Sequence, residues 1–273
     1  MNFIKILFVI LIGLLVSCQE TVNDFDLPYK EQLVVRAILS AGESQKKIKI
    51  EKTLHPLEKF DSENFIVKDA IVKITQENEV FDFTFDGQNY SNNKFIPKEG
   101  VVYNFSAEWN DKKVIGETRV PFKPVFDSLY WYIDTSENDF GGVIYTFYTY
   151  VEPKNNTFYL GGMIHENDNI ITTTDSLSAW NILSSNGKVR VVLGSFYKFE
   201  VSEQKFLKSI YDDYFFVVTA YDEPFYAYFN TRNNGQSSSS IFGMEGTNVQ
   251  WNVKGDGIGL FLGSAEYRKQ FKY

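Results

Sequence analysis

Apolar and polar residues alternate with a period of two over much of the chain beyond residue 30. Residues 48–52 place Ile48 and Ile50 on one side and Lys49 and Glu51 on the other, as a strand with one wet face does. Residues 79–85 alternate in the same way and bring Phe81, Phe83 and Phe85 to one face. The pattern predicts short β-strands rather than helices.

The predicted strands of the first half follow one another closely. They cover residues 33–39, 48–52, 69–75, 79–85, 101–109 and 113–120. Asn110 and Asp111 separate the last two and predict a tight hairpin. Six or seven short strands in about 90 residues is the spacing of a β-sandwich.

Pro121 and Pro124 mark the expected domain boundary, because proline removes a backbone donor and holds the chain extended. Longer predicted strands follow at residues 127–133, 143–151, 157–165, 188–196 and 214–221. Ser202 precedes one short helix and Asp222 is the expected N-cap of another. We therefore predict an all-β fold with one or two short helices: a β-sandwich domain over residues 31–121, then a second β-rich domain over residues 122–273.

The first residues have the layout of a secretory signal. Lys5 precedes an apolar segment, residues 8–16, that is shorter than a membrane-spanning helix requires. It ends at Leu15-Val16-Ser17-Cys18, which resembles the bacterial lipobox, whose cysteine receives a diacylglyceryl group; the alternative is an ordinary signal with a chance cysteine. We predict a signal peptide over residues 1–17, lipidation at Cys18 and a lipidated tether over residues 18–30 that holds the protein to a membrane.

Cys18 is also the one cysteine of the sequence. A disulfide, a thiolate metal site and a catalytic cysteine are therefore excluded from the body of the chain. Gln19 follows the cysteine where an aspartate would indicate inner-membrane retention, which favours the outer membrane. The acidic residues Glu20, Asp24 and Asp26 resemble a surface-export signal, so we expect an anchor that faces the cell surface.

The net charge of −8 disfavours nucleic-acid partners, since an acidic surface repels phosphate backbones. Aromatic residues make up 17% of the chain, which favours strands. Such richness also fits a sugar-binding platform, although core packing explains most of it. Tyr130, Trp131 and Tyr132 are the candidate ligand-binding aromatics.

Catalytic motifs are scarce. His55 and His165 are the only histidines, and no Gly-x-Ser-x-Gly segment offers a nucleophile. The carboxylate pairs Asp212-Asp213 and Asp222-Glu223 could serve a glycosidase, but capping or solvated charge explains them better. Residues 255–259 lack the surrounding βαβ unit of a dinucleotide loop. We expect no catalytic residues, no cofactor and no metal.

The order of several segments resembles the Bacteroidota lipoproteins grouped as domain-of-unknown-function family 4249. The segments are the lipobox, residues 33–39, 69–74, 100–105, 126–129 and 222–228, and the closing residues 252–261. The most specific piece is the closing Asn-Val-x-Gly-x-Gly-Ile-Gly-x-Phe, in which Asp256 stands where we expect glycine. The resemblance covers nearly the whole mature chain and implies an immunoglobulin-like or transthyretin-like first half.

The resemblance also implies a role, because such lipoproteins are typically encoded beside TonB-dependent outer-membrane transporters. It leads us to expect a non-enzymatic accessory subunit that takes part in nutrient uptake. A stand-alone surface lipoprotein that binds glycan or peptide is the alternative, and a carboxylate hydrolase fits the sequence least.

The closing segment carries a structural hypothesis of its own. Its marked residues are Asn252, Gly255, Gly257, Gly259 and Phe261. In an extended strand the three glycines share one side, so that another backbone can approach. We expect Ile258 and Leu260 to enter the core from the other side. The bare strip should pack against the second domain's sheet or the helix around Tyr226; the alternative is a docking strip for a transporter.

Overall fold

The computed structural model describes residues 29–43, 48–59, 61, 64–134, 143–165, 171–173, 182–183, 187–198, 201–234 and 249–273. Cys18 and most of the predicted tether lie outside this part. Residues 31–54 and 60–273 form one compact unit, to which the following description applies unless stated otherwise. No helix in the described part of the chain is long and apolar enough to cross a membrane.

A six-stranded antiparallel sheet forms one layer of the first half, in the order β15-β7-β6-β3-β4-β5. Its strands are β3 (Ile71–Gln76), β4 (Glu79–Phe85), β5 (Tyr90–Ser91), β6 (Val102–Trp109), β7 (Lys112–Arg119) and β15 (Lys254–Gly255). Asn110 turns between β6 and β7 with φ +52°, as the predicted hairpin requires. The edge strand β15 comes from near the C-terminal end of the chain and pairs with β7.

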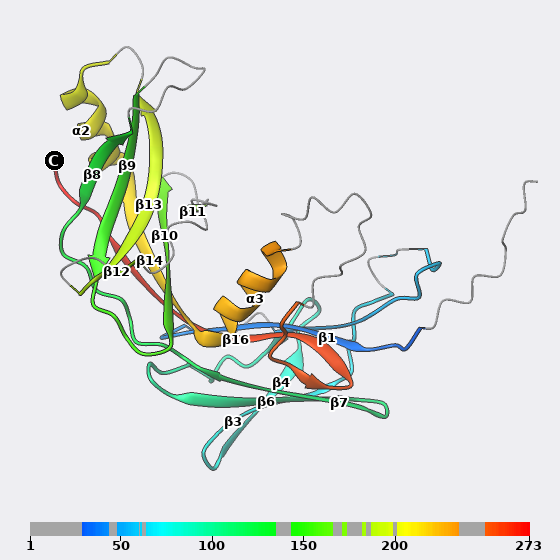
Figure 1. Ribbon diagram of the computed structural model, residues 1–273. Helices are drawn as coiled ribbons and strands as arrows, with labels where there is room; N and C mark the ends of the chain where they lie inside the picture. Colours follow the sequence, from blue (N-terminus) through cyan, green and yellow to red (C-terminus); the bar gives the residue numbers. More distant parts are fainter. Residues whose placement is uncertain are drawn as a thin grey trace, which may run out of the picture. The chain divides into compact units, whose positions relative to one another are not determined.

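A second six-stranded sheet has the order β11-β10-β14-β16-β1-β2. Its strands are β1 (Leu33–Ser40), β2 (Lys49–Lys52), β10 (Thr157–His165), β11 (Ile171–Thr173), β14 (Tyr214–Asp222) and β16 (Gly257–Lys269). The first part of β16 pairs with β1 in parallel, whereas its last part pairs with β14 antiparallel. Strand β16 therefore joins the β10–β14 part of this sheet to the β1–β2 part (Figure 1).

The remaining sheet has four strands in the order β12-β13-β9-β8. They are β8 (Tyr130–Asp134), β9 (Val143–Val151), β12 (Ile182–Leu183) and β13 (Val189–Lys198). Helix α2 (Glu203–Asp213) begins after Ser202, whose hydroxyl accepts the Lys205 N–H at 3.4 Å. Helix α3 (Glu223–Asn234) follows Asp222 directly, with Pro224 in its first turn. Both helices start where the sequence predicts them.

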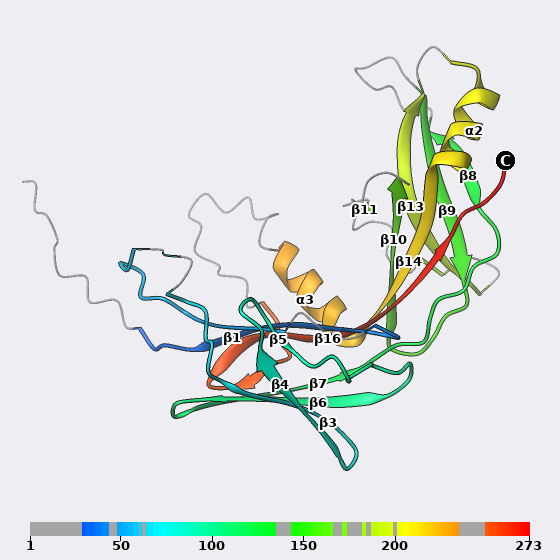
Figure 2. The same cartoon turned by 180° about the vertical axis from the view of Figure 1, so that it is seen from behind.

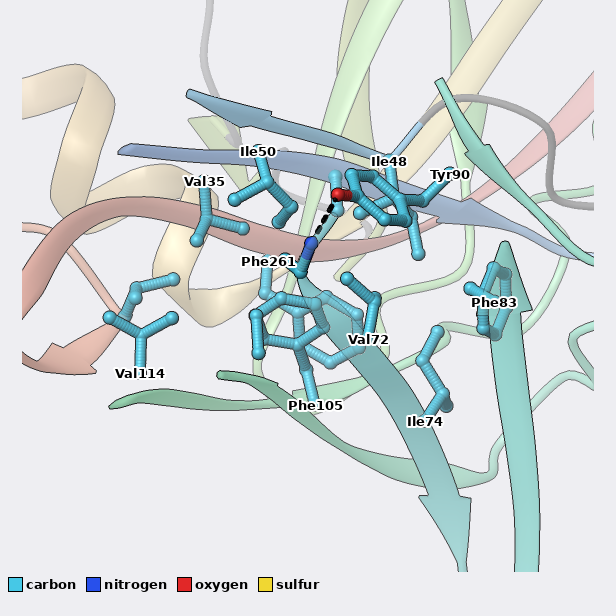
Figure 3. Packing of buried hydrophobic residues seen from close by; sticks show 14 of the residues in the cluster. Val35, Ile48, Ile50, Val72, Ile74, Phe83, Tyr90, Phe105, Val114 and Phe261 are labelled. Atoms are coloured by element: carbon cyan, nitrogen blue, oxygen red, sulfur yellow. Dashed lines mark hydrogen bonds between the residues drawn. The ribbon is translucent and has the colours of Figure 1, made fainter. Parts of the chain in front are cut away.

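The described residues of this unit form two hydrophobic cores. The first lies between the β1–β2–β16 layer and the β3–β6–β7 layer, which face each other in Figure 2, and Figure 3 shows Phe105 and Phe261 stacked at its centre. Their ring centroids are 5.2 Å apart. The second core collects side chains from β9, β10, β13, β14 and α2, including Phe147 and Phe216.

The predicted all-β fold with two short helices and a sandwich-like first half is confirmed. The domain ranges 31–121 and 122–273 stay a prediction. Phe261 and Val253, from the end of the chain, lie in the first core with residues 33–120, and Tyr267 packs against the second core. The closing strand thus contributes to both.

Candidate functional site

The predicted aromatic trio lies on strand β8, where successive side chains point to opposite sides. Tyr130 and Tyr132 are 42% and 41% exposed. Trp131 turns inward and packs against the second core, with its ring centroid 5.3 Å from that of Tyr145. The structure therefore brings two of the three predicted residues to one exposed face and places the third inside.

Strand β9 adds two tyrosines to this face, because its register sets Tyr148 opposite Tyr130. The rings of Tyr130 and Tyr148 stack at 5.5 Å with an interplanar angle of 22°. Tyr150 meets Tyr148 edge to face at 5.6 Å, and Tyr132 lies 6.0 Å from Tyr148. Tyr148 is the centre of the group.

Arg190 enters the same face from strand β13, opposite Tyr150. Its Cζ lies 4.2 Å from the ring centroid of Tyr148 and 5.0 Å from that of Tyr132, within the range of cation–π attraction. Its buried Nε has no hydrogen-bond partner among the described residues. We call Tyr130, Tyr132, Tyr148, Tyr150 and Arg190 the tyrosine face.

The tyrosine face presents aromatic rings and a guanidinium as a broad surface. Burial raises the pKa of the Tyr148 phenol, with a further contribution from Tyr150, so its hydroxyl stays neutral and can donate or accept. Tyrosine and arginine are the residue types that dominate binding hot spots. Sequence reasoning missed Tyr148, Tyr150 and Arg190, since only the strand register brings them beside Tyr130.

The closing motif folds around Asn252. Its side-chain Oδ1 accepts the Phe261 N–H at 2.9 Å, and its Nδ2 donates to the Phe261 carbonyl and, at 3.2 Å, to the Glu117 carbonyl. Asn252 therefore holds β16 beside β7 at the point where Phe261 enters the first core. Asp256, which stands where glycine is expected, accepts the Lys113 N–H at 3.3 Å through Oδ2.

The three motif glycines lie where a neighbouring backbone approaches. A Cβ atom on Gly255 would lie 2.3 Å from the Lys113 carbonyl oxygen, and one on Gly257 would lie 2.4 Å from that of Leu33. Gly259 has φ +137°, and its Cβ would lie 2.1 Å from the Val35 carbonyl oxygen. No side chain larger than hydrogen fits these positions without a shift of the backbone.

Two expectations about this strip are wrong. It packs against β1 and β7 rather than the second half's sheet or α3, because β16 returns to close the first sandwich. Ile258 and Leu260 stay partly exposed, while Phe261, on the glycine side, is buried. A single sequence does not reveal which strands β16 pairs with. Those partners decide which face of β16 lies in the core.

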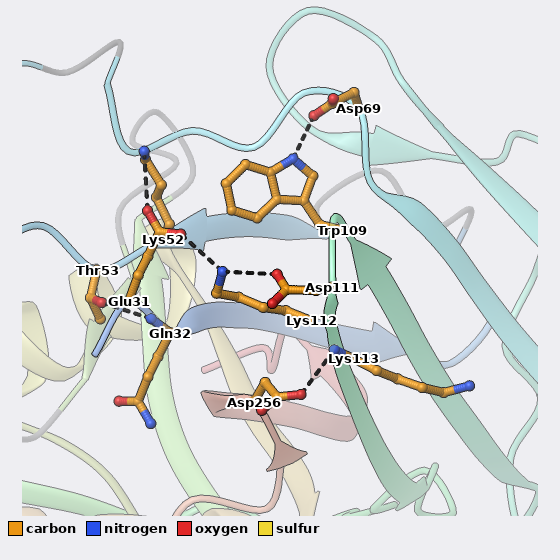
Figure 4. A network of polar contacts seen from close by, with 10 residues as sticks. All are labelled: Glu31, Gln32, Lys52, Thr53, Asp69, Trp109, Asp111, Lys112, Lys113 and Asp256. Carbon is orange, nitrogen blue, oxygen red and sulfur yellow. Dashed lines mark hydrogen bonds and ion pairs between the residues drawn. The ribbon is translucent and has the colours of Figure 1, made fainter.

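The β6–β7 hairpin carries a self-satisfied polar network (Figure 4). Glu31 bridges Lys112 at 3.1 Å and Lys52 at 3.3 Å, and its hydrogen bond from Lys112 lowers the pKa of its carboxyl group. Both ammonium groups lie within 6 Å of the Trp109 ring, whose Nε1 donates to Asp69 at 2.8 Å. Because its charged groups already bind one another, the network has a structural role. It stabilises the position of Glu31, directly after the predicted tether.

The residues considered for catalysis lie apart or have structural partners. Asp212 pairs with Lys208 on the surface of α2. Asp222 is buried and accepts the Thr118 hydroxyl; burial raises its pKa to about 7. His165 meets the Tyr214 ring edge to face at 5.1 Å. Within the described ranges, no group of three or more histidine, cysteine, aspartate or glutamate side chains could hold a metal ion.

Comparison with models of protein families finds a match that covers most of the chain. Residues 20–270 match the family described as "Domain of unknown function (DUF4249)". A search of curated proteins finds no match. The family match covers nearly the whole body that the structure describes, both cores and the closing motif included. The chain therefore belongs to the DUF4249 family.

Proposed function

We propose that this DUF4249 protein is a Bacteroidota outer-membrane lipoprotein, acylated at Cys18 and facing the cell surface. It serves as a non-enzymatic accessory subunit of a TonB-dependent transporter in nutrient uptake. The tyrosine face is the surface that contacts the transporter. The sequence before residue 31 supports the anchor, and the family resemblance supports the partner.

The observation that carries the docking role is the composition and exposure of the tyrosine face. Tyr130 and Tyr132 are each about two-fifths exposed, and Arg190 lies stacked among the rings without an ion-pair partner in the described chain. The rings hold one another in place, so little side-chain entropy is lost on binding. A protein partner suits such a broad face better than a small molecule does, because protein–protein contacts do not need an enclosed pocket, whereas small-molecule binding usually does.

The predicted tether makes the contact feasible. Residues 18–30 span at most about 45 Å when fully extended, roughly the thickness of a bilayer with its headgroups. A body attached through a tether of this length can reach the exposed parts of an integral membrane partner. Two acyl chains keep it at the membrane, so that the effective concentration of the partner is high.

Affinity purification from detergent-solubilised outer membranes tests the proposal. The tagged wild-type protein should bring down a TonB-dependent transporter in stoichiometric amount. The variant Tyr130→Ser/Tyr132→Ser should lose the transporter but keep its melting temperature, whereas Tyr273→Ser, which removes a 55% exposed tyrosine elsewhere, should retain it. Cys18→Ser should leave the N-terminal peptide unacylated and release the protein from the membrane fraction.

Two results would reject this function. A lone wild-type lipoprotein in the eluate, with no transporter, contradicts the accessory role and favours the stand-alone binding alternative. A Cys18→Ser variant that is still acylated at its N-terminal peptide contradicts the lipoprotein assignment.

A further inference from the structure

A cleft of about 750 Å³ opens between the first half and helix α3. Its walls come from β3, β6 and β7, from the first turns of α3, and from residues 250–254. The volume lies within the range of sites that hold small molecules. A much smaller cavity beneath β2 holds about 30 Å³ and has room for little more than water.

Trp251 supplies an exposed aromatic surface to the cleft. Its side chain is 38% exposed, and its ring lies 5.3 Å from that of Tyr228 on α3. The backbone is fixed on both sides of it: the Gln250 N–H donates to the Thr231 hydroxyl at 2.9 Å, and Asn252 is held against Phe261. The indole is therefore preorganised, which lowers the entropic cost of stacking a ligand on it.

Three polar residues of the cleft are available for a ligand. Asn104, Glu117 and Glu223 line it, and none of their side chains makes a hydrogen bond or ion pair with another described residue. They combine amide and carboxylate oxygens with an amide donor. Such a set suits a ligand that carries many donors and acceptors around an apolar ring.

The charges of the cleft argue for a neutral ligand. Two glutamates line it, while Lys113 is already paired with Glu108 at 2.6 Å, so Lys254 is left to balance both carboxylates. An anionic ligand such as a phosphate or a uronate would be repelled. A strongly cationic ligand would meet the ammonium group of Lys254.

The geometry also disfavours an extended peptide. Peptides that add to a sheet need a free edge strand. Here β15 already pairs with β7 at Val114 and Ile115, so this part of the edge is occupied. A ligand of the cleft would therefore be recognised by side chains, namely the Trp251 indole and the unpaired polar groups.

We propose that this cleft binds a neutral saccharide, with a sugar ring stacked on Trp251 and its hydroxyls bonded by Asn104, Glu117 and Glu223. The site lies on residues separate from the tyrosine face. The protein thus carries one surface for a transporter and another for a glycan. The saccharide would be the nutrient in the proposed uptake role, and in that sense the proposal rests on it. The evidence for saccharide binding comes from the cleft and does not depend on the transporter.

Isothermal titration of the folded wild-type protein with cellohexaose, maltohexaose, xylohexaose and mannohexaose tests the site. At least one should bind, with an affinity that changes little between low and high salt because the ligand is uncharged. Trp251→Ala should weaken it at least tenfold, and Trp251→Phe should restore part of the loss. Glu117→Gln, which keeps an acceptor oxygen but removes the charge, should change it by less than about threefold.

The control variants separate this site from the tyrosine face. Tyr130→Ser/Tyr132→Ser should bind the saccharide as the wild-type protein does, and Trp251→Ala should still bring down the transporter. The inference is overturned if no hexasaccharide of the panel binds, or if Trp251→Ala binds as tightly as the wild-type protein. It is also overturned if a cationic peptide library binds the cleft in a salt-dependent manner that Glu117→Gln abolishes.

Discussion

The closing strand β16 and the tyrosine face are built in opposite ways. At its start β16 presents bare backbone, and the carbonyls of Leu33 and Val35 approach positions 257 and 259 so closely that a methyl group does not fit. The tyrosine face presents large side chains that pack chiefly against one another, with Tyr130 and Tyr132 open to solvent.

The difference separates stability from recognition. Glycines beside a neighbouring backbone allow two sandwich layers to close, so β16 should be intolerant of substitution. Rings on an outer sheet face remove little apolar surface from water in the isolated chain. The tyrosine face should therefore tolerate substitution. The segment that is most distinctive in the sequence is therefore structural, and the surface proposed for binding consists of ordinary tyrosines.

The largest effect is expected at Gly259. Gly259→Ala should destabilise the protein by about 4 kcal/mol, because the added Cβ meets the Val35 backbone and because φ +137° is unfavourable for any residue with a Cβ. Urea denaturation followed by circular dichroism measures the change.

Gly42 provides a matched control, since it also has positive φ, +76°, but has nothing within 4 Å of its would-be Cβ. Gly42→Ala should cost about 1 kcal/mol. Equal costs at the two positions would mean that backbone conformation alone matters and that the close approach of β1 contributes nothing.

The next effect concerns Asp222, which lies beside β16 and links stability to pH. Burial raises its pKa to about 7, against 3.8 for an exposed aspartate, while the Thr118 hydroxyl and the Gly263 backbone oppose the rise. The fold therefore favours the neutral carboxyl group. Stability from this group is fully present below pH 3.8 and falls as the pH rises towards 7.

Asp222→Asn isolates this contribution, because asparagine keeps an oxygen for the Thr118 hydroxyl but does not ionise. Between pH 5 and pH 8 the variant should gain about 2–3 kcal/mol relative to the wild-type protein. Paired urea titrations at both pH values measure it. A constant difference between the two proteins would show that Asp222 ionises normally in the folded chain.

Local patterns predicted most of the fold because they arise from local physics. Alternating burial gave the strands of the first half, and the Ser202 cap and Asp222-Glu223-Pro224 marked where α2 and α3 begin. The partners of β16 were not predictable in this way. A glycine strip shows that something approaches closely, but contacts across more than 200 residues, such as Ser40 with Ser264, decide what it is.

The candidate site was predictable only in part for the same reason. Tyr130 and Tyr132 stand out in one strand, and period-two alternation already implies that Trp131 points the other way. Their partners Tyr148 and Arg190 come from two further strands, whose registers depend on turns and core packing. The cleft at Trp251 likewise depends on where α3 and the end of the chain return.

The smallest effect is expected within the tyrosine face, between Arg190 and Tyr148. A double-mutant cycle with Arg190→Met and Tyr148→Leu should give a coupling of about 0.5–1 kcal/mol, the value of a partly exposed cation–π contact at 4.2 Å. A cycle of Arg190→Met with the distant Tyr273→Ser should give none. Both are measured by urea denaturation.

A coupling above about 2 kcal/mol would place Arg190 among the groups that hold the fold together, and the contrast with β16 would then fail. A small coupling, together with loss of the transporter on substitution of Tyr130 and Tyr132, is the combination expected of a surface shaped for a partner.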